Sequence, residues 1–202
     1  MTMAFDAQSE TSDEVLMVLY ANGDRHAALA LTQRVTPRVT AYAARLLSGD
    51  RAEAEDVAQE TLLRLWRIAP EWRQGETKVT TWAYRVATNL CIDRQRSRGR
   101  KRQVALDDAP EVADGSVGAE GRLQEAGRMA ALEAALAELP DRQRQAVVLR
   151  HLEGMTNPEI AAIMEIGVEA VESLTARGKR ALSAILAGRK AELGYEDDRD
   201  AG

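Results

Sequence analysis

Cysteine and histidine are nearly absent from this chain of 202 residues. The single cysteine, Cys91, excludes an internal disulfide framework, and two histidines, His26 and His151, are too few for a cysteine–histidine metal cluster or for catalysis. No apolar run approaches the roughly 20 residues that span a bilayer, and no signal-peptide pattern opens the chain. We therefore expect a soluble cytoplasmic protein with no metal, no cofactor, no small-molecule substrate and no membrane contact of its own.

Enzyme motifs and aromatic residues are also scarce. No nucleophile elbow or phosphate-binding loop is present, so no catalytic residue is predicted and the chain is not expected to be an enzyme. Aromatic residues make up only 4% of the chain, whereas hydrophobic residues reach 45%, which is enough for a core. Alanine, leucine, arginine and glutamate dominate, and these residues favour helices over strands. The composition predicts an all-α protein.

Charge is distributed unevenly along the chain, although the net value is only −5. Residues 51–102 carry 12 basic and 7 acidic side chains, and residues 141–190 carry 8 and 6. The stretch between them, residues 103–140, carries 2 basic and 8 acidic side chains. Two basic blocks separated by an acidic stretch indicate two modules that face a polyanion, joined by a linker.

The first block has the signals of four consecutive helices. Turn or break signals stand at Asn22-Gly23, Ser48-Gly49 and Pro70. The helices are expected over residues 12–21, 24–47, 53–68 and from about 80 to 102. Residues 103–127 contain glycine, proline and acidic residues without a helical period over the first eighteen positions, which predicts an extended, mobile linker.

The second block contains a helix-turn-helix pattern. We expect helices over residues 128–139 and 140–154, followed by a short helix that starts with the capping-box pair Thr156 and Glu159. Gly167 marks a turn before a longer helix that carries cations. In a helix-turn-helix, this second helix enters the major groove of DNA. The alternative is an ordinary helical hairpin with a solvated face.

The residues of the longer helix divide into two groups. The first half would lie near base edges and the second half near phosphates or bases. The first group is Glu169, Ala170, Glu172 and Ser173, and the second is Arg177, Lys179 and Arg180.

Residues 94–102 contain six cations within nine positions. They form either a phosphate-binding strip or a solvated helix end, where cations favour the negative pole of the helix dipole. Upstream, Trp82 and Tyr84 offer flat faces that could stack on unpaired bases, although aromatic residues on such a helix are more often core residues. The helix over 53–68 also has a polar face, for which a solvated surface is the simple alternative.

Several of these stretches, taken together, resemble one family. "AEAEDVAQETLLRLWR", a glycine-bearing loop and "TTWAYRVATNLCIDRQRSR" resemble region two of the sigma-seventy family. "ALAELPDRQRQAVVLRHLEGMTNPEIAAIM" and "VEAVESLTARGKRAL" resemble its region four. The match covers roughly residues 12–102 and 128–188, in the family's order. The chain is therefore similar to the extracytoplasmic-function, or group four, sigma factors of bacteria.

The resemblance implies a role for each group of residues. Docking on the clamp coiled coil of core RNA polymerase is implied for Asp56, Gln59, Glu60, Leu63 and Arg64. Contact with the minus-ten promoter element is implied for Trp72, Arg73, Thr81, Trp82, Tyr84, Arg85, Asn89, Arg94, Arg96 and Arg98. The loop over residues 71–77 would capture a flipped base. Contact with the minus-thirty-five element is implied for Thr156 and for the two groups on the longer helix.

The expected protein is thus a sigma factor with core RNA polymerase, promoter DNA and an anti-sigma factor as partners. The expected parts are region two (12–102), an acidic linker (103–127), region four (128–190) and a disordered acidic tail (191–202). Two departures from the family stand out: Glu165 occupies a turn position where glycine is usual, and Glu172 replaces a common cation. Two rival functions remain, a stand-alone helix-turn-helix regulator and a helical protein-interaction adaptor.

Overall fold

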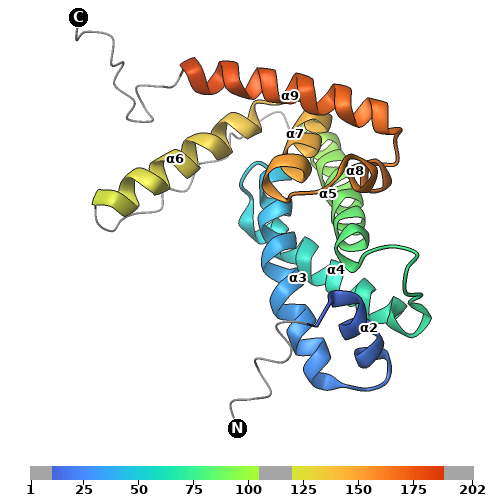
Figure 1. Ribbon diagram of the computed structural model, residues 1–202. Helices are drawn as coiled ribbons and strands as arrows, with labels where there is room; N and C mark the ends of the chain where they lie inside the picture. The colour runs from blue at the N-terminus through green and yellow to red at the C-terminus, as the bar shows by residue number, and fades with distance from the viewer. Residues whose placement is uncertain (1–10, 105–119, 189–202) are drawn as a thin grey trace, which may run out of the picture.

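The computed structural model describes residues 11–104 and 120–188. Helices and connecting turns make up these residues, and no strand occurs among them. Figure 1 shows two groups of helices, one from each range, that lie against one another. The predicted all-α class with two helical domains is therefore confirmed. Most of the predicted acidic linker (105–119) and the predicted tail (191–202) lie outside the described residues.

The first domain consists of four helices and a 3₁₀ turn over Ala69–Glu71. Side chains cap three of the helices at their start, because the Ser12 hydroxyl and the carboxylates of Asp24 and Asp50 accept hydrogen bonds from first-turn amides. The helices are α2 (Asp13–Ala21), α3 (Arg25–Leu46), α4 (Arg51–Ile68) and α5 (Val79–Val104). The predicted order is confirmed, and the third helix starts two residues earlier than expected.

The second domain contains four helices and a π-helical turn over Val148–Leu152. The helices are α6 (Glu120–Ala137), α7 (Asp141–Val147), α8 (Asn157–Met164) and α9 (Val168–Gly188). Helix α6 begins at Glu120, well before the expected start near residue 128. Its first turns contain two glycines, which concealed the helical pattern, but the other residues are good helix formers and the cost of each glycine is only about 1 kcal/mol.

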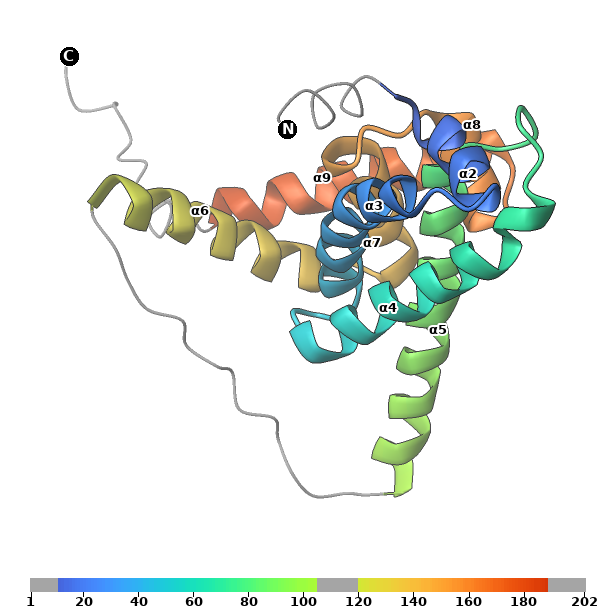
Figure 2. The same ribbon diagram turned by 90° about the horizontal axis from the view of Figure 1, so that it is seen from below.

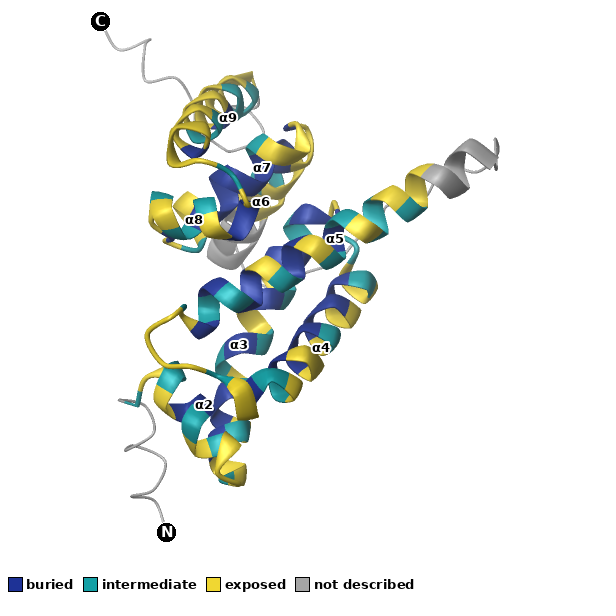
Figure 3. Cartoon of the chain, turned by 90° about the vertical axis from the view of Figure 1, so that its right-hand side faces the viewer, coloured by how far each residue is buried: buried dark blue, intermediate teal, exposed yellow. Residues whose placement is uncertain are grey.

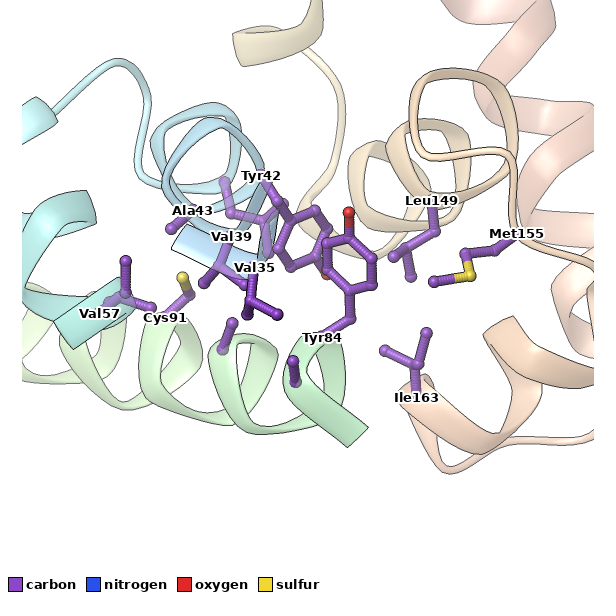
Figure 4. Close-up of a cluster of buried hydrophobic side chains, with 14 of the residues drawn as sticks. Val35, Val39, Tyr42, Ala43, Val57, Tyr84, Cys91, Leu149, Met155 and Ile163 are labelled. Atoms are coloured by element: carbon purple, nitrogen blue, oxygen red, sulfur yellow. The ribbon is translucent and has the colours of Figure 1, made fainter. Parts of the chain in front are cut away.

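A single apolar core runs through both domains. Tyr42 and Tyr84 lie near its middle with ring centroids 5.0 Å apart in an edge-to-face arrangement. The Tyr42 hydroxyl also shares a 2.7 Å hydrogen bond with the hydroxyl of Thr88. Figure 4 shows the two tyrosines in a cluster drawn from both domains, with Val35, Val39, Ala43, Val57 and Cys91 on one side and Leu149, Met155 and Ile163 on the other. The boundary between the domains is therefore packed with apolar side chains.

Helix α5 has different surroundings along its length. Its N-terminal half packs against α3, α4 and α8, whereas its C-terminal part extends away from both bundles (Figures 2 and 3). Cys91 is fully buried, as expected for a core residue, and burial raises the pKa of its thiol to about 12. The part of α5 around Trp82 and Tyr84 and the cationic part that begins at Arg94 thus lie in different environments.

Candidate nucleic-acid and partner interfaces

One face of α4 carries the five residues predicted to dock on a partner protein. Asp56, Gln59, Leu63 and Arg64 are exposed and Glu60 is half-buried, since their spacing of three or four residues places them on one side of the helix. The Arg64 Nε donates a 2.8 Å hydrogen bond to Glu60 and lowers the pKa of that carboxyl. Leu63 is an apolar side chain that remains 50% exposed between these polar groups.

Some of the residues predicted to face the minus-ten element are exposed, and others are buried. Arg85 and Asn89 are exposed on α5, and Arg73 is exposed in the loop before it, where it pairs with Glu76 at 3.5 Å. Thr81 and Tyr84 are instead buried, with exposed fractions of 6% and 1%. The predicted set therefore lies on two sides of the same helix.

Two tryptophans meet at the junction of the loop and α5. The ring centroids of Trp72 and Trp82 lie 6.4 Å apart and the rings are nearly perpendicular. Both side chains are half-buried and pack against the core. The Trp72 indole N–H and the Thr81 hydroxyl are buried without a hydrogen-bond partner among the described residues. An unpaired buried donor is costly, so a further hydrogen-bond acceptor at the junction of the loop and α5 would be stabilising.

The cationic strip on α5 is partly neutralised within the chain. Arg94 forms an ion pair with Glu53, and Arg98 forms ion pairs with Asp50 and, at 3.4 Å, with Glu53. Arg96 is exposed, and no ion pair to it occurs in the described part of the chain. The start of α4 therefore holds two of the six cations, a pairing that the sequence spacing did not reveal.

Helices α8 and α9 form the predicted helix-turn-helix. The capping box is present: the Thr156 hydroxyl accepts a hydrogen bond from the Glu159 amide, and the Glu159 carboxylate accepts from the Thr156 amide. The exposed face of α9 carries every residue that was predicted for it: Glu169, Ala170, Glu172, Ser173, Arg177, Lys179 and Arg180. Asn157 Nδ2 donates to Glu172 at 3.4 Å, which links the two helices of the motif.

The turn of this motif contains a strained residue. Glu165 ends α8 with φ 53° and ψ 49°, the left-handed conformation in which glycine has no steric penalty. Further along, α9 crosses α7 at Gly178, where an added Cβ would lie 2.6 Å from Val147 Cγ2 and 3.1 Å from the Gln143 carbonyl oxygen. Position 165 thus carries a glutamate where the backbone favours glycine, and position 178 requires glycine.

Sequence reasoning missed the residues that join the two domains. The carboxylate of Glu153 accepts hydrogen bonds from the Tyr84 hydroxyl and from Arg45, and Lys78 Nζ lies 2.7 Å from Glu159 Oε1. These partners are 69 to 108 positions apart in the chain. No local pattern carries such information, because a polar residue at the surface and one at an interface look alike in sequence.

Neither a metal-binding cluster nor a membrane-spanning helix occurs among the described residues. No group of three or more histidine, cysteine, aspartate or glutamate side chains there could hold a metal ion. Within residues 11–104 and 120–188, no helix is both long and apolar enough to cross a membrane.

Comparison with known proteins points to one family. Residues 31–101 match the model for sigma-70 region 2, and residues 129–182 match the model for sigma-70 region 4. The chain is 35% identical over 189 residues to the ECF RNA polymerase sigma factor SigE of Mycolicibacterium smegmatis, covering 91% of this chain and 72% of that protein. It is 30% identical over 184 residues to the ECF RNA polymerase sigma factor SigM of Mycobacterium tuberculosis, with 91% and 89% covered.

A solved structure has the same fold. The sigma factor RpoE in complex with the anti-sigma factor NepR from Bartonella quintana superposes with a TM-score of 0.62 at 24% identity. The superposition covers 76% of this chain and 92% of that one.

Proposed function

Because the chain belongs to the sigma-70 family, we propose that it is an extracytoplasmic-function sigma factor that directs core RNA polymerase to promoters. The observation that carries this proposal is that the two family regions occur in order, each on the helices that the function needs. Relatives named as RNA polymerase sigma factors cover 91% of the chain. Sigma factors act by binding, so the protein has no catalytic step of its own and works in the bacterial cytoplasm.

The exposed face of α4 binds core polymerase. Its pattern of a half-exposed leucine surrounded by polar groups is typical of a protein interface, where a buried apolar anchor supplies most of the binding energy. Leu63 is the anchor, and Asp56, Gln59, Glu60 and Arg64 form the polar rim.

A matched pair of leucines tests this assignment. Leu63 on α4 is 50% exposed and Leu29 on α3 is 49% exposed, so the two leucines lie on different helices but are almost equally exposed. We expect Leu63→Ala to weaken binding to core polymerase about tenfold, or roughly 1.4 kcal/mol. Leu29→Ala should bind within twofold of the unaltered chain. Equal affinities of the two variants, measured by fluorescence anisotropy of a labelled chain, would contradict the assignment.

The minus-ten element is bound at the loop over residues 71–77 and along α5. An unstacked base needs a flat surface and hydrogen-bond partners to offset the cost of leaving the duplex. Trp72 and Trp82 offer the surface, and Arg73, Arg85 and Asn89 are exposed beside them. Arg94, Arg96 and Arg98 then hold the backbone of the opened strand.

The ion pairs on α5 provide a test of whether its arginines hold the DNA backbone. Each phosphate contact steepens the log–log salt dependence of binding by about 0.7 on single strands. Arg96→Ala should remove one such contact, because Arg96 has no ion pair with a described residue. Arg94→Ala should change the slope less, since Arg94 is paired with Glu53. The measurement is anisotropy of a labelled mixed-sequence oligonucleotide across a salt series.

The exposed face of α9 recognises the minus-thirty-five element. Glu169, Ala170, Glu172 and Ser173 lie in the first turns, where a recognition helix meets base edges, and glutamate can accept from the N4 amine of cytosine. Arg177, Lys179 and Arg180 follow on the same exposed surface and contact phosphates. Thr156, at the start of α8, completes the set.

An anti-sigma factor is a further partner. The support is that RpoE of Bartonella quintana, which shares the fold, was solved with the anti-sigma factor NepR.

Transcription with core enzyme decides between the sigma-factor function and its rivals. We expect promoter-dependent run-off transcripts from fragmented genomic DNA only when both the chain and core polymerase are present. A stand-alone helix-turn-helix regulator would shift operator DNA without polymerase, and a protein-interaction adaptor would bind no DNA in either condition. The absence of any core-dependent transcript would overturn the proposal.

A further inference from the structure

We propose that the cleft at the corner between α3 and α4 is a binding site for a small zwitterion of the short-peptide class. This site is separate from the promoter contacts proposed above. The cleft has a volume of about 770 Å³, and its walls come from α3, the turn before α4, α4 itself and α6. Cavities that hold small molecules have volumes of about 300–1,000 Å³, so the cleft has the size of a ligand site.

Two of the residues that line the cleft contain a buried polar atom without a hydrogen bond. These atoms are the Thr36 hydroxyl oxygen and Arg45 Nε, and neither has a partner among the described residues. Thr32, one turn earlier on α3, donates its hydroxyl to the Ala28 carbonyl oxygen at 2.8 Å, as helical threonines commonly do. Because an unpaired buried polar group destabilises a fold, a ligand that supplies an acceptor would offset the cost at Thr36 and Arg45.

The turn between the two helices carries backbone strain. Ser48 has a φ of 57°, the left-handed conformation that is costly for a residue with a Cβ, and Gly49 follows with a φ of 88°. Both residues line the cleft. Residues in such conformations cluster at ligand-binding turns, where the backbone must point a group in a fixed direction. The strained turn is thus a second feature of the cleft that a ligand site would explain.

The charged side chains around the cleft indicate the class of ligand. Arg45 and Arg51 lie on either side of the turn, whereas Glu55 lies one turn further along α4 and Glu133 lies on α6. Within residues 11–104 and 120–188, no ion pair engages Arg51, Glu55 or Glu133. A simple anion would meet the two glutamates, and a simple cation would meet the two arginines. A ligand with a carboxylate at one end and an ammonium group at the other satisfies both pairs.

The remaining wall of the cleft suits a short peptide. Pro37, Ala41 and Ala44 line it from α3, and their small side chains leave room for the backbone and methyl groups of a ligand. The free carboxylate of the peptide would accept hydrogen bonds from the two arginines, and its free amine would donate to the two glutamates. The cleft also contains Gln59, which belongs to the α4 face proposed for core polymerase.

Titration with trialanine, a tripeptide with both termini free, tests the charge assignment. We expect trialanine to bind the full chain with a Kd on the order of 1 mM, the range for a ligand of this size, and to shift the amide resonance of Gly49 in NMR spectra. Acetylating its amine or amidating its carboxylate should each weaken binding about tenfold, because each change removes one charge. No binding, equal binding of the three peptides, or an unmoved Gly49 resonance would overturn the proposal.

Two charge variants place the ligand in the cleft. Arg51→Ala and Glu133→Gln should each weaken trialanine binding about tenfold, and both residues are exposed, so the fold should be kept. Arg67→Ala is the matched control, because Arg67 is exposed on α4 but lies outside the cleft. It should bind trialanine within twofold of the unaltered chain. Equal affinities of Arg51→Ala and Arg67→Ala would exclude this cleft as the binding site.

A pair of threonine variants separates a binding role from a structural one. Thr36→Val replaces an unpaired buried hydroxyl with a methyl group of similar size, so it should raise Tm while it weakens trialanine binding. Thr32→Val instead breaks the hydrogen bond to Ala28, so it should lower Tm and leave the affinity unchanged. A lower Tm or an unchanged affinity in Thr36→Val would count against the site. These measurements need neither polymerase nor DNA, so their outcome is independent of the sigma-factor function.

Discussion

The two domains differ in how they obtain their stability. The first domain has long helices, of 22, 18 and 26 residues in α3 to α5, and each of these helices buries a full apolar stripe. The second domain has helices of 18, 7, 8 and 21 residues, and the 21-residue helix α9 fully buries only Val171 and Gly178. A helix that keeps one face exposed has less surface to bury.

The second domain makes up for its thin core by specific contacts. Arg144 donates hydrogen bonds to the carbonyl oxygens of Leu136, Ala137 and Leu139 at the C-terminal end of α6. Gly178 lets α9 approach α7 closely, and the apolar cluster around Leu149 continues into the first domain. Single substitutions should therefore damage the second domain more than the first.

The largest effect is expected at Arg144. Arg144→Ala removes the hydrogen bonds that its guanidinium donates to the carbonyl oxygens of Ala137 and Leu139, and it should lower the free energy of unfolding by about 3–4 kcal/mol. The measurement is urea unfolding of the full chain. Arg142→Ala, an exposed arginine on the same helix, should change it by less than about 0.5 kcal/mol. Similar losses of unfolding free energy in both variants would show that the hydrogen bonds of Arg144 do not stabilise the second domain.

The close approach of α9 to α7 gives the next effect. Gly178→Ala places a methyl group against Val147 and should cost about 1–2 kcal/mol, because the clash outweighs the better helix propensity of alanine. In Gly127→Ala the new methyl group meets nothing within 4 Å, so the propensity gain should raise stability by about 0.5–1 kcal/mol. Thermal unfolding of the two variants should therefore shift in opposite directions. A higher Tm in both variants would mean that α9 can move away from α7 without cost.

The turn between α8 and α9 allows a stabilising change. Glu165→Gly removes the penalty of a left-handed residue with a Cβ and should raise the free energy of unfolding by about 0.5–1 kcal/mol, or Tm by about 2 °C. Gly154 has a φ of 70°, so Gly154→Ala should destabilise the chain by about 1 kcal/mol. An unchanged or lower Tm in Glu165→Gly would show that the glutamate side chain supplies a compensating contact.

The smallest effect concerns pH. Hydrogen bonds from Lys78 and from Thr156 lower the pKa of Glu159 from 4.5 to about 2. A lowered pKa stabilises the folded state above pH 4.5, and this contribution is lost as the pH falls from 4.5 toward 2. The urea midpoints of the unaltered chain and of Glu159→Gln should therefore converge between pH 6 and pH 3. A constant gap between the two midpoints would contradict the assignment.

Much of the fold could be read from local sequence signals. The caps at Asp24 and Thr156, the turn at Asn22-Gly23 and the apolar periods are short-range features, so the helices follow from residues within a few positions of each other. The start of α6 could not be placed, because its glycines look like a linker in sequence although helix-forming neighbours outweigh them. The candidate site followed from family motifs, and its residues lie on the helices that were expected.

The helices, their order and the polar faces of α4 and α9 follow from local sequence alone. The packed chain shows which half of α5 is covered, because Tyr84, which the sequence predicted as a base-contacting residue, is buried and bonded to the second domain. It also decided that Arg94 and Arg98 are paired, through Glu53 and Asp50 of another helix. The physical reason is that helix formation depends on near neighbours, whereas burial and ion pairing depend on residues that only the packed chain brings together.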